Sequence, residues 1–140
     1  MRSSRAARIR AYVDTSAFIA FLDRSDSYHA LFRGLFSAPP PLITSALVVA
    51  EGHGWFLRRY DRRRATQFLA FINILPDLTI QPFEAAELAG ATVMLKKFGD
   101  QDLTLADAHG LAVMRARSVS DCWSTDWHLG LDGGRLAIQR

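Results

Sequence analysis

Short apolar runs alternate with longer amphipathic stretches along most of this chain. The short runs are rich in residues that favour β-strands, such as Tyr12, Val13 and Ile43, and polar residues or prolines bound them. They predict strands over 12–14, 42–44, 78–80, 119–125 and 136–138.

The stretches between these runs repeat apolar residues at spacings of three and four, the pattern of a helix with one buried face. Ser16, Ser45, Asp61 and Thr104 stand where helix caps are expected. Helices are predicted over 16–22, 28–36, 45–60, 62–75, 84–98 and 104–117, with one helical turn over 126–129. Strands alternating with helices predict an α/β fold with a mostly parallel sheet, and no linker or repeat divides residues 1–140, so we expect a single domain.

Four of the 14 acidic residues stand in apolar surroundings rather than in polar turns. Asp14 and Asp126 end predicted strands, while Glu51 and Asp107 lie in predicted helices. The carboxyl ends of strands are where open α/β sheets bind ligands. A buried carboxylate needs a positive partner, and no Lys or Arg occurs in the nine residues after Asp14. We hypothesise that the partner is a metal ion.

Each acid also has a purely structural interpretation. Asp14 could cap the first helix, and Asp126 could cap the turn that follows it. Asp107 stands three residues after Thr104, the spacing of a capping box. Glu51 lies too deep in its helix for a cap. Four carboxylates brought together would repel each other unless cations neutralised them, and Mg²⁺ and Mn²⁺ prefer oxygen ligands.

The composition, with 49% hydrophobic and 22% charged residues, is that of an ordinary globular protein. The single cysteine, Cys122, excludes an internal disulfide and a cysteine-rich zinc site, and we expect it to be a buried apolar residue. No apolar run approaches the ~18 residues of a membrane span. Four arginines precede the first strand, as in the basic region of a signal peptide: Arg2, Arg5, Arg8 and Arg10. Charged residues interrupt and end the apolar run that follows them, so we expect a soluble, cytoplasmic protein.

The net charge is +3, and five arginines are concentrated where two predicted helices meet: Arg58, Arg59, Arg62, Arg63 and Arg64. This cluster could bind an RNA backbone, and a solvated helix end explains it equally well. The four histidines show no zinc-binding spacing, so we interpret all of them as structural or surface residues: His29, His53, His109 and His128.

The order of these elements resembles the PIN-domain ribonucleases, in particular the small toxins of VapBC-type toxin–antitoxin pairs. The family's opening strand-Asp-Thr-Ser matches residues 13–16, and its helix acid matches Glu51. Its Leu-Thr-x-x-Asp-Ala element matches residues 103–108, and its Thr-x-Asp-x-His-Phe element is echoed by residues 124–129. The fourth element departs from the family, with Thr125 directly before Asp126 and leucine as residue 129. The Gly133-Gly134 ending also differs from the usual proline-containing turn.

The resemblance implies a three-layer fold with a short five-stranded sheet between helices. It implies an endoribonuclease dependent on Mg²⁺ or Mn²⁺, acting on tRNA, rRNA or mRNA, often as a homodimer and blocked by a cognate antitoxin. Asp14, Glu51, Asp107 and Asp126 would be the catalytic, metal-binding acids. The hydroxyl groups of Thr15, Ser16 and Thr125 would support these acids. Asp102 is a possible extra acid or a helix cap.

In the mechanism that this resemblance implies, a water molecule activated by the metal attacks a phosphodiester bond of the RNA. The products carry a 5′-phosphate and a 3′-hydroxyl. Two other functions stay open. A phosphotransferase could use Asp14 as its nucleophile, although the second acid expected two residues later is Ser16. A non-catalytic RNA-binding or regulatory module could keep the fold without the activity.

Overall fold

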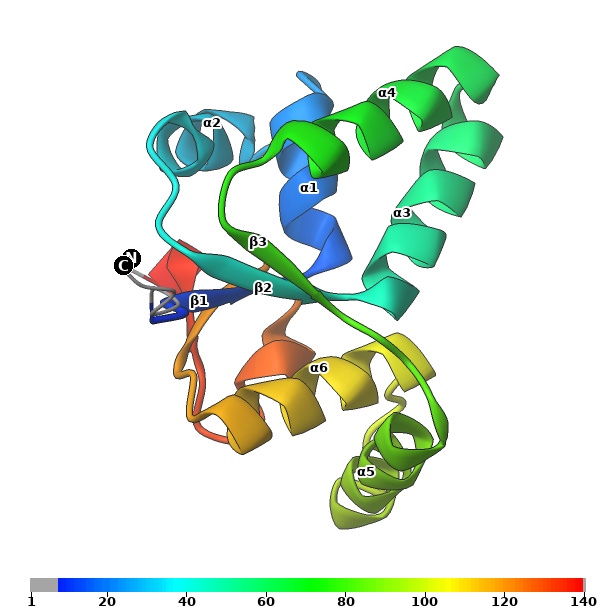
Figure 1. The fold of residues 1–140 in the computed structure, drawn as a ribbon, viewed down its shortest axis with the longest axis vertical. Helices are drawn as coiled ribbons and strands as arrows, with labels where there is room; N and C mark the ends of the chain where they lie inside the picture. The colour runs from blue at the N-terminus through cyan, green and yellow to red at the C-terminus, as the bar shows by residue number, and fades with distance from the viewer. Residues whose placement is uncertain (1–7, 140) are drawn as a thin grey trace, which may run out of the picture.

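Five parallel strands form one sheet in the computed structural model, which describes residues 8–139 (Figure 1). Arg2 and Arg5 of the predicted basic segment lie outside these residues. The spatial order of the strands is β3-β2-β1-β4-β5. Their bounds are β1 Ala11–Val13, β2 Leu42–Ser45, β3 Leu78–Gln81, β4 Asp121–Trp123 and β5 Arg135–Leu136.

Helices cover both faces of this sheet and complete the three predicted layers. One layer contains α1 Thr15–Leu22, α2 His29–Ser37, α3 Ala46–Arg59 and α4 Arg62–Ile74. The other contains α5 Ala85–Lys97, α6 Leu105–Arg117 and the 3₁₀ turn η1 Trp127–Gly130, and a second such turn, η2 Ala137–Gln139, follows β5. None of the helices within residues 8–139 has both the length and the apolar character needed to cross a membrane.

Side chains cap several helices as the sequence predicts. The Ser45 hydroxyl accepts a bond of 3.0 Å from the Leu47 N–H, and the Asp61 carboxylate accepts one of 2.9 Å from the Arg64 N–H. These bonds satisfy backbone donors that have no partner within the helix. The starts of α3 and α4 are therefore set locally, by residues next to them in sequence.

The last two strands differ from the prediction. The fourth strand is limited to Asp121–Trp123, because the backbone stops pairing with the sheet at Ser124. The Ser124 hydroxyl donates a hydrogen bond to the Asp14 carboxylate. The fifth is two residues long and begins at Arg135, and the next residues turn into η2. This turn is stabilised by the Gln139 side chain, which accepts a bond of 3.1 Å from the Leu136 N–H.

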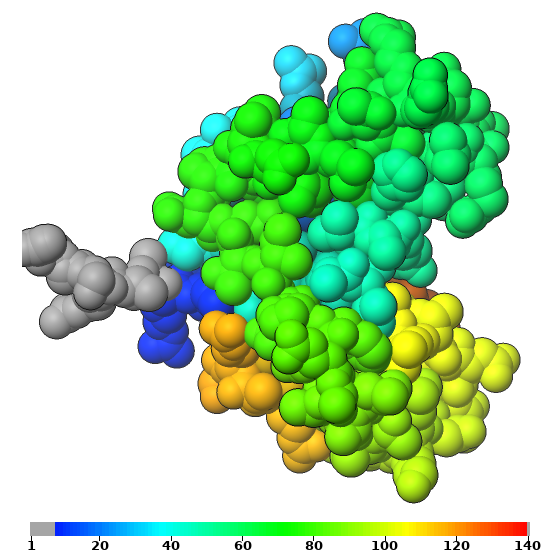
Figure 2. All heavy atoms as spheres, turned by 45° about the vertical axis from the view of Figure 1, so that its right-hand side comes forward, coloured from blue at the N-terminus to red at the C-terminus, as the bar shows by residue number. Residues whose placement is uncertain are grey.

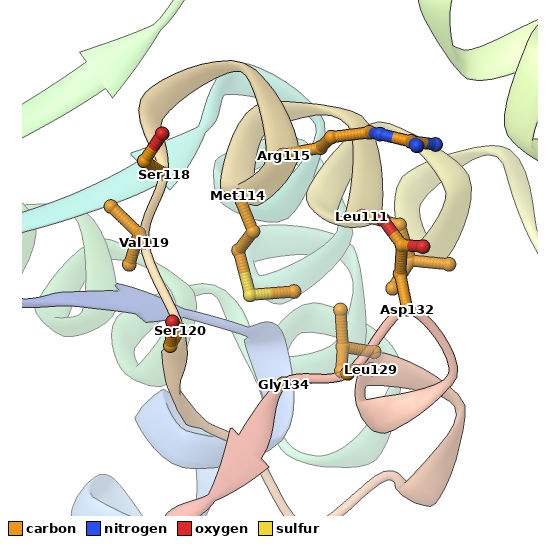
Figure 3. Close-up of a pocket in the computed structure, with 10 residues that line it drawn as sticks. Leu111, Met114, Arg115, Ser118, Val119, Ser120, Leu129, Asp132 and Gly134 are labelled. Carbon is orange, nitrogen blue, oxygen red and sulfur yellow. The ribbon is translucent and has the colours of Figure 1, made fainter.

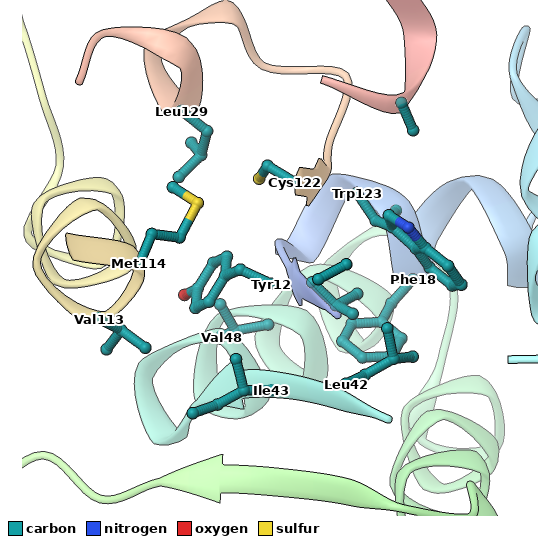
Figure 4. Close-up of a cluster of buried hydrophobic side chains, with 14 of the residues drawn as sticks. Tyr12, Phe18, Leu42, Ile43, Val48, Val113, Met114, Cys122, Trp123 and Leu129 are labelled. Carbon is teal, nitrogen blue, oxygen red and sulfur yellow. The ribbon is translucent and has the colours of Figure 1, made fainter. Parts of the chain in front are cut away.

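Packed aromatic rings fill the space between the sheet and α1–α4. The Phe36 ring lies 5.7 Å from that of Phe18 and 5.0 Å from that of Trp123. Figure 4 shows Phe18 and Trp123 on this side and Tyr12 with Met114 on the α6 side, with Cys122 buried as expected. The short strands are thus enclosed on both faces, which explains their continuous apolar runs.

Gly52 permits close packing of α3 against α4. A Cβ atom there would lie 2.5 Å from Cζ of Phe68, whose side chain is fully buried. Gly52→Ala is therefore expected to lower the free energy of unfolding by about 1–3 kcal/mol, measured by urea unfolding. Gly34→Ala is the matched control, because a Cβ in that part of α2 meets nothing within 4 Å and should stabilise the helix by about 0.5–1 kcal/mol. Equal effects of the two substitutions would contradict the close contact.

Candidate metal centre

Asp14 lies at the carboxyl end of β1 and is almost fully buried, with 5% of its surface exposed. Its Oδ2 accepts one hydrogen bond of 3.0 Å from the Ser16 hydroxyl and one of 2.9 Å from the Ser124 hydroxyl. The helix α1 begins one residue earlier than predicted, with Asp14 as its N-cap residue but without a side-chain cap bond. Ser16 therefore does not cap the helix as predicted; its hydroxyl holds Asp14.

Among residues 8–139, no cationic side chain forms an ion pair with the buried Asp14 carboxylate. The pKa of this group is raised to about 6: desolvation is the largest cause and the charge of Asp107 adds to it, while hydrogen bonds from Ser124, the Thr15 backbone and Ser16 lower it only in part. A buried carboxylate whose pKa is raised by a second carboxylate is the arrangement expected where a bound cation completes a site.

Glu51 extends from α3 towards the amino end of α1. Its carboxylate accepts a hydrogen bond from the Thr15 hydroxyl, so Thr15 supports an acid as the resemblance implies. Glu51 is exposed, although apolar residues precede it in the sequence. The hydrogen bond to Thr15 places the Glu51 carboxylate at the start of α1.

Asp107 helps to cap α6 and also lies close to other acids. Its N–H donates to the Thr104 hydroxyl at 3.1 Å, and its Oδ2 accepts from the Thr104 N–H at 3.2 Å, which completes the capping box of α6. The residue is buried all the same, and desolvation raises its pKa, with further contributions from the charges of Asp126 and Glu51. A cap thus holds this acid close to two of the others.

Asp126 and His128 complete the group. Asp126 Oδ1 accepts from the His128 backbone N–H at 3.0 Å and lies 3.0 Å from Nδ1 of its ring. The ligand atoms of Asp107, Asp126 and His128 all lie within 4.8 Å of one another. The interpretation of His128 as a structural or surface residue is therefore incomplete, since the tight turn η1 brings its ring to the acids.

Ser124 is a contact residue that the prediction missed. Its hydroxyl donates to Asp14 and accepts a bond of 2.9 Å from the Asp126 N–H, so one side chain links two of the acids. The Thr125 hydroxyl was predicted to support the acids. In the structure it is the backbone N–H of Thr125 that takes part, and it donates a hydrogen bond of 2.9 Å to the Ser16 hydroxyl. The signal was present in the sequence, because Ser124 stands two residues before Asp126, where the family element has threonine.

These groups come from both layers of helices and meet at one edge of the sheet. In Figure 1, α3 and α6 both begin at the edge where β1 and β2 end, and Figure 2, with this edge turned forward, shows the two starts next to each other on the surface. Most of the donors are carboxylate oxygens, which suit Mg²⁺ or Mn²⁺, and the remaining donor is the His128 imidazole. The residues therefore fit a site for such an ion.

A family model of the PIN domain matches residues 11–127. The chain belongs to the PIN-domain family. No curated protein matches this sequence. The identification agrees with the parallel sheet, its two layers of helices and the acids at its carboxyl edge.

Solved structures with the same fold include several toxins. The Mycobacterium tuberculosis toxin VapC20, described as cleaving the sarcin-ricin loop, has a TM-score of 0.80 and 24% identity over 89% of this chain and 96% of its own. A Klebsiella pneumoniae toxin–antitoxin complex has a TM-score of 0.61 and 15% identity over 90% of this chain and 94% of its own. Rickettsia felis VapBC2, bound to a promoter DNA fragment, has a TM-score of 0.61 and 12% identity over 91% and 97%. At these identities the likeness establishes the fold of the PIN domain.

The remaining candidates of this PIN domain lie away from the acids or are used in its packing. Asp102 is exposed in the loop before α6. Nδ1 of His29 lies 2.9 Å from the Ala20 carbonyl oxygen, and Nδ1 of buried His109 lies 2.6 Å from the Ser45 hydroxyl, which are structural contacts as predicted. The Arg64 guanidinium donates to the Leu22 carbonyl and lies 4.4 Å from the centre of the Tyr60 ring, whereas the other four arginines of the cluster are exposed.

A pocket of about 320 Å³ lies at the carboxyl end of α6, far along that helix from Asp107 (Figure 3). Its lining includes Met114, Ser118 and Leu129 and contains none of the four predicted acids. The candidate metal centre of the PIN domain is therefore separate from this pocket.

The link made by Ser124 can be tested directly. Ser124→Ala removes a hydrogen bond that lowers the pKa of Asp14 and leaves the Asp126 N–H without its partner, so we expect a 10- to 100-fold loss of Mn²⁺ affinity, measured by calorimetry. Ser124→Thr keeps the hydroxyl and should retain most of the affinity. Thr125→Ala keeps the backbone N–H and should lose less than Ser124→Ala. A larger loss in Thr125→Ala would restore the original prediction.

Proposed function

We propose that this chain is a metal-dependent endoribonuclease and the toxin of a toxin–antitoxin pair, with residues 1–140 acting as one domain. The observation that carries the proposal is the close grouping of Asp107, Asp126 and His128, with Glu51 and Asp14 near enough to Asp107 for their charges to interact and with the pKa of Asp14 raised to about 6. Because a protein gains nothing in stability from gathering unpaired carboxylates, the arrangement argues for a function that needs them.

In the proposed site, Asp14, Glu51, Asp107 and Asp126 hold Mg²⁺ or Mn²⁺, with His128 beside Asp126. When bound, the ion supplies Lewis-acid stabilisation of charge on the phosphate and a lower pKa for water. The chain provides the geometry. Ser16 and Ser124 hold Asp14, and three further contacts fix the other acids: Thr15 with Glu51, Thr104 with Asp107, and His128 with Asp126.

RNA is the proposed substrate because the fold is that of VapC20, which is described as cleaving the sarcin-ricin loop. The exposed arginines at the end of α3 and the start of α4 would contact phosphates of an extended RNA, which remains one of the two interpretations of that cluster. The Klebsiella and Rickettsia structures contain a toxin with its antitoxin, which supports a cognate antitoxin for this chain. We propose a homodimer on the family resemblance.

The two other functions make different demands on the site. A phosphotransferase that uses Asp14 as its nucleophile needs an acid two residues later, whereas Ser16 there donates its hydroxyl to Asp14. A non-catalytic RNA-binding module needs no acids at all. The presence of all four, each held by a hydrogen bond, favours the nuclease.

Cleavage of a pool of structured and single-stranded RNA, including tRNA and rRNA fragments, tests the proposal. The purified chain, free of antitoxin, is incubated with the pool in Mg²⁺, in Mn²⁺ and in EDTA, and the ends are mapped. Cuts that require the metal and leave 5′-phosphates support the nuclease. RNA binding without cleavage, and undiminished by EDTA, would support the binding module instead.

A further inference from the structure

Trp127 is a large aromatic residue left exposed beside the acids. It follows Asp126 directly, begins η1 and has 58% of its surface exposed. Single exposed apolar side chains are common on protein surfaces. The ring of Trp127 differs from them in lying against the ring of His128, next to the acids.

The contacts of this ring lead back to the acids. The ring lies 4.2 Å from the ring of His128, at an interplanar angle of 32°. His128 in turn is held by Asp126 Oδ1 through its backbone N–H and its Nδ1, both at 3.0 Å. One face of the indole is therefore backed by an imidazole, and the exposed part of the ring is available to a partner.

The position of the ring is as informative as its orientation. The His128 ring belongs to the group whose ligand atoms lie within 4.8 Å of one another, together with Asp107 and Asp126. Trp127 is thus one side chain away from the acids, at the rim of the candidate metal centre. An RNA strand whose phosphate is held at these acids would therefore pass beside the indole.

The chemistry of this rim favours a neutral, planar partner. The carboxylates of Asp107 and Asp126 repel phosphates that the metal does not hold, so charge alone anchors RNA poorly beside them. A base can stack on an aromatic ring without charge, and such stacking tolerates every base because each has a π-face. Stacking on a ring that is already fixed also costs little conformational entropy.

We propose that Trp127 stacks on a nucleobase next to the scissile phosphate and so positions the RNA strand over the acids. The proposal rests on the proposed ribonuclease function, and Trp127 is a positioning residue in it. The proposal implies that the RNA is unpaired at the cleavage site, because a base stacked inside a continuous helix has no free face for the indole.

Tryptophan fluorescence tests the stacking separately from cleavage. The chain has three tryptophans, of which Trp123 is buried and Trp55 is partly buried. The Asp14→Asn protein in Mg²⁺ is titrated with decaadenylate and with a ten-residue abasic ribose-phosphate chain of equal charge. We expect decaadenylate to quench the emission, the abasic chain not to, and the quenching to disappear in Asp14→Asn with Trp127→Phe. Quenching that survives Trp127→Phe, or that the abasic chain reproduces, would overturn the proposal.

Cleavage kinetics give the second readout. Trp127→Ala is expected to raise KM for a cleaved RNA about tenfold or more with a smaller change in kcat, and Trp127→Phe should restore most of the loss. Tyr28→Ala removes another exposed aromatic ring, 40% exposed before α2, and is the control. If the parent cuts RNA and Trp127→Ala has the parent's KM, the stacking is wrong while the nuclease stands. If Trp127→Ala changes only the oligomeric state, measured by light scattering, the ring is a contact between copies and the proposal is wrong.

Discussion

Asp14→Asn is expected to reduce RNA cleavage at least 100-fold while the protein remains folded. Replacing residues that only support metal ligands costs 10- to 100-fold, and Asp14 is the most buried of the four acids in the proposed site. The asparagine amide oxygen can accept the same bonds from Ser16 and Ser124, so the geometry is kept and the charge is removed. Single-turnover cleavage in saturating Mg²⁺ measures the loss.

Asp77→Asn is the matched control for this substitution. Asp77 is exposed in the turn before β3, at the opposite edge of the sheet, and its φ of 54° suits asparagine as well as aspartate. The Asp77→Asn protein should therefore cleave RNA at the rate of the parent protein. Asp14→Asn protein that cuts RNA as fast as Asp77→Asn would remove the basis of the proposed function.

The second large effect of Asp14→Asn has the opposite sign, because the metal-free protein should become more stable. The pKa of Asp14 is about 6 in the fold, compared with about 3.9 in an unfolded chain, so at pH 7 folding confines a charge that burial disfavours. Asparagine removes this cost, and we expect the free energy of unfolding in EDTA to rise by about 2 kcal/mol at pH 7.

The pH dependence identifies Asp14 as the source of this difference. Because the folded protein binds the Asp14 proton more tightly than the unfolded chain, this group contributes a stability that falls as pH rises from about 4 to about 6. The gain of Asp14→Asn should therefore be present at pH 7 and almost absent at pH 4. Thermal unfolding in EDTA at both values, with Asp77→Asn as the control, measures it. If Asp14→Asn were less stable than the parent at pH 7, burial of the Asp14 charge would not be destabilising the folded protein.

Together the two effects describe a site maintained at a cost in stability. Added Mg²⁺ should raise the melting temperature of the parent at pH 7 and have less effect on Asp14→Asn, because the ion binds the folded state. A substitution that stabilises the fold and removes activity is expected where charges are gathered for catalysis.

Much of the fold could be predicted from local features of the sequence. The alternation of short apolar runs with amphipathic stretches located the five strands and six helices found in residues 8–139, and Ser45, Asp61 and Thr104 marked the starts of three of the helices. These features are local, because a cap or an apolar face depends on residues within one or two turns. Errors occurred at β4 and β5, where distant partners decide how far pairing extends.

The four acids could be found in sequence, but their relations could not. The sequence left Asp107 as either a cap or a site residue, and the structure shows that the cap holds it among the other acids. Glu51 was recognised as an acid inside a helix, but only the structure shows that it is exposed and that Thr15 from another helix is bonded to it. Ser124 was passed over for Thr125, because only the direction of the chain after β4 decides which hydroxyl faces Asp14.

The sequence by itself therefore determined the elements, their order and the kinds of chemical group available at the carboxyl edge of the sheet. The tertiary structure alone decided which hydroxyl supports which acid, that His128 joins the group, and that Trp127 stands exposed beside it. The physical reason is the range of the interactions. Caps and periodicity act over a few residues, whereas desolvation and the repulsion between Asp14 and Asp107 arise only when segments about 90 residues apart meet.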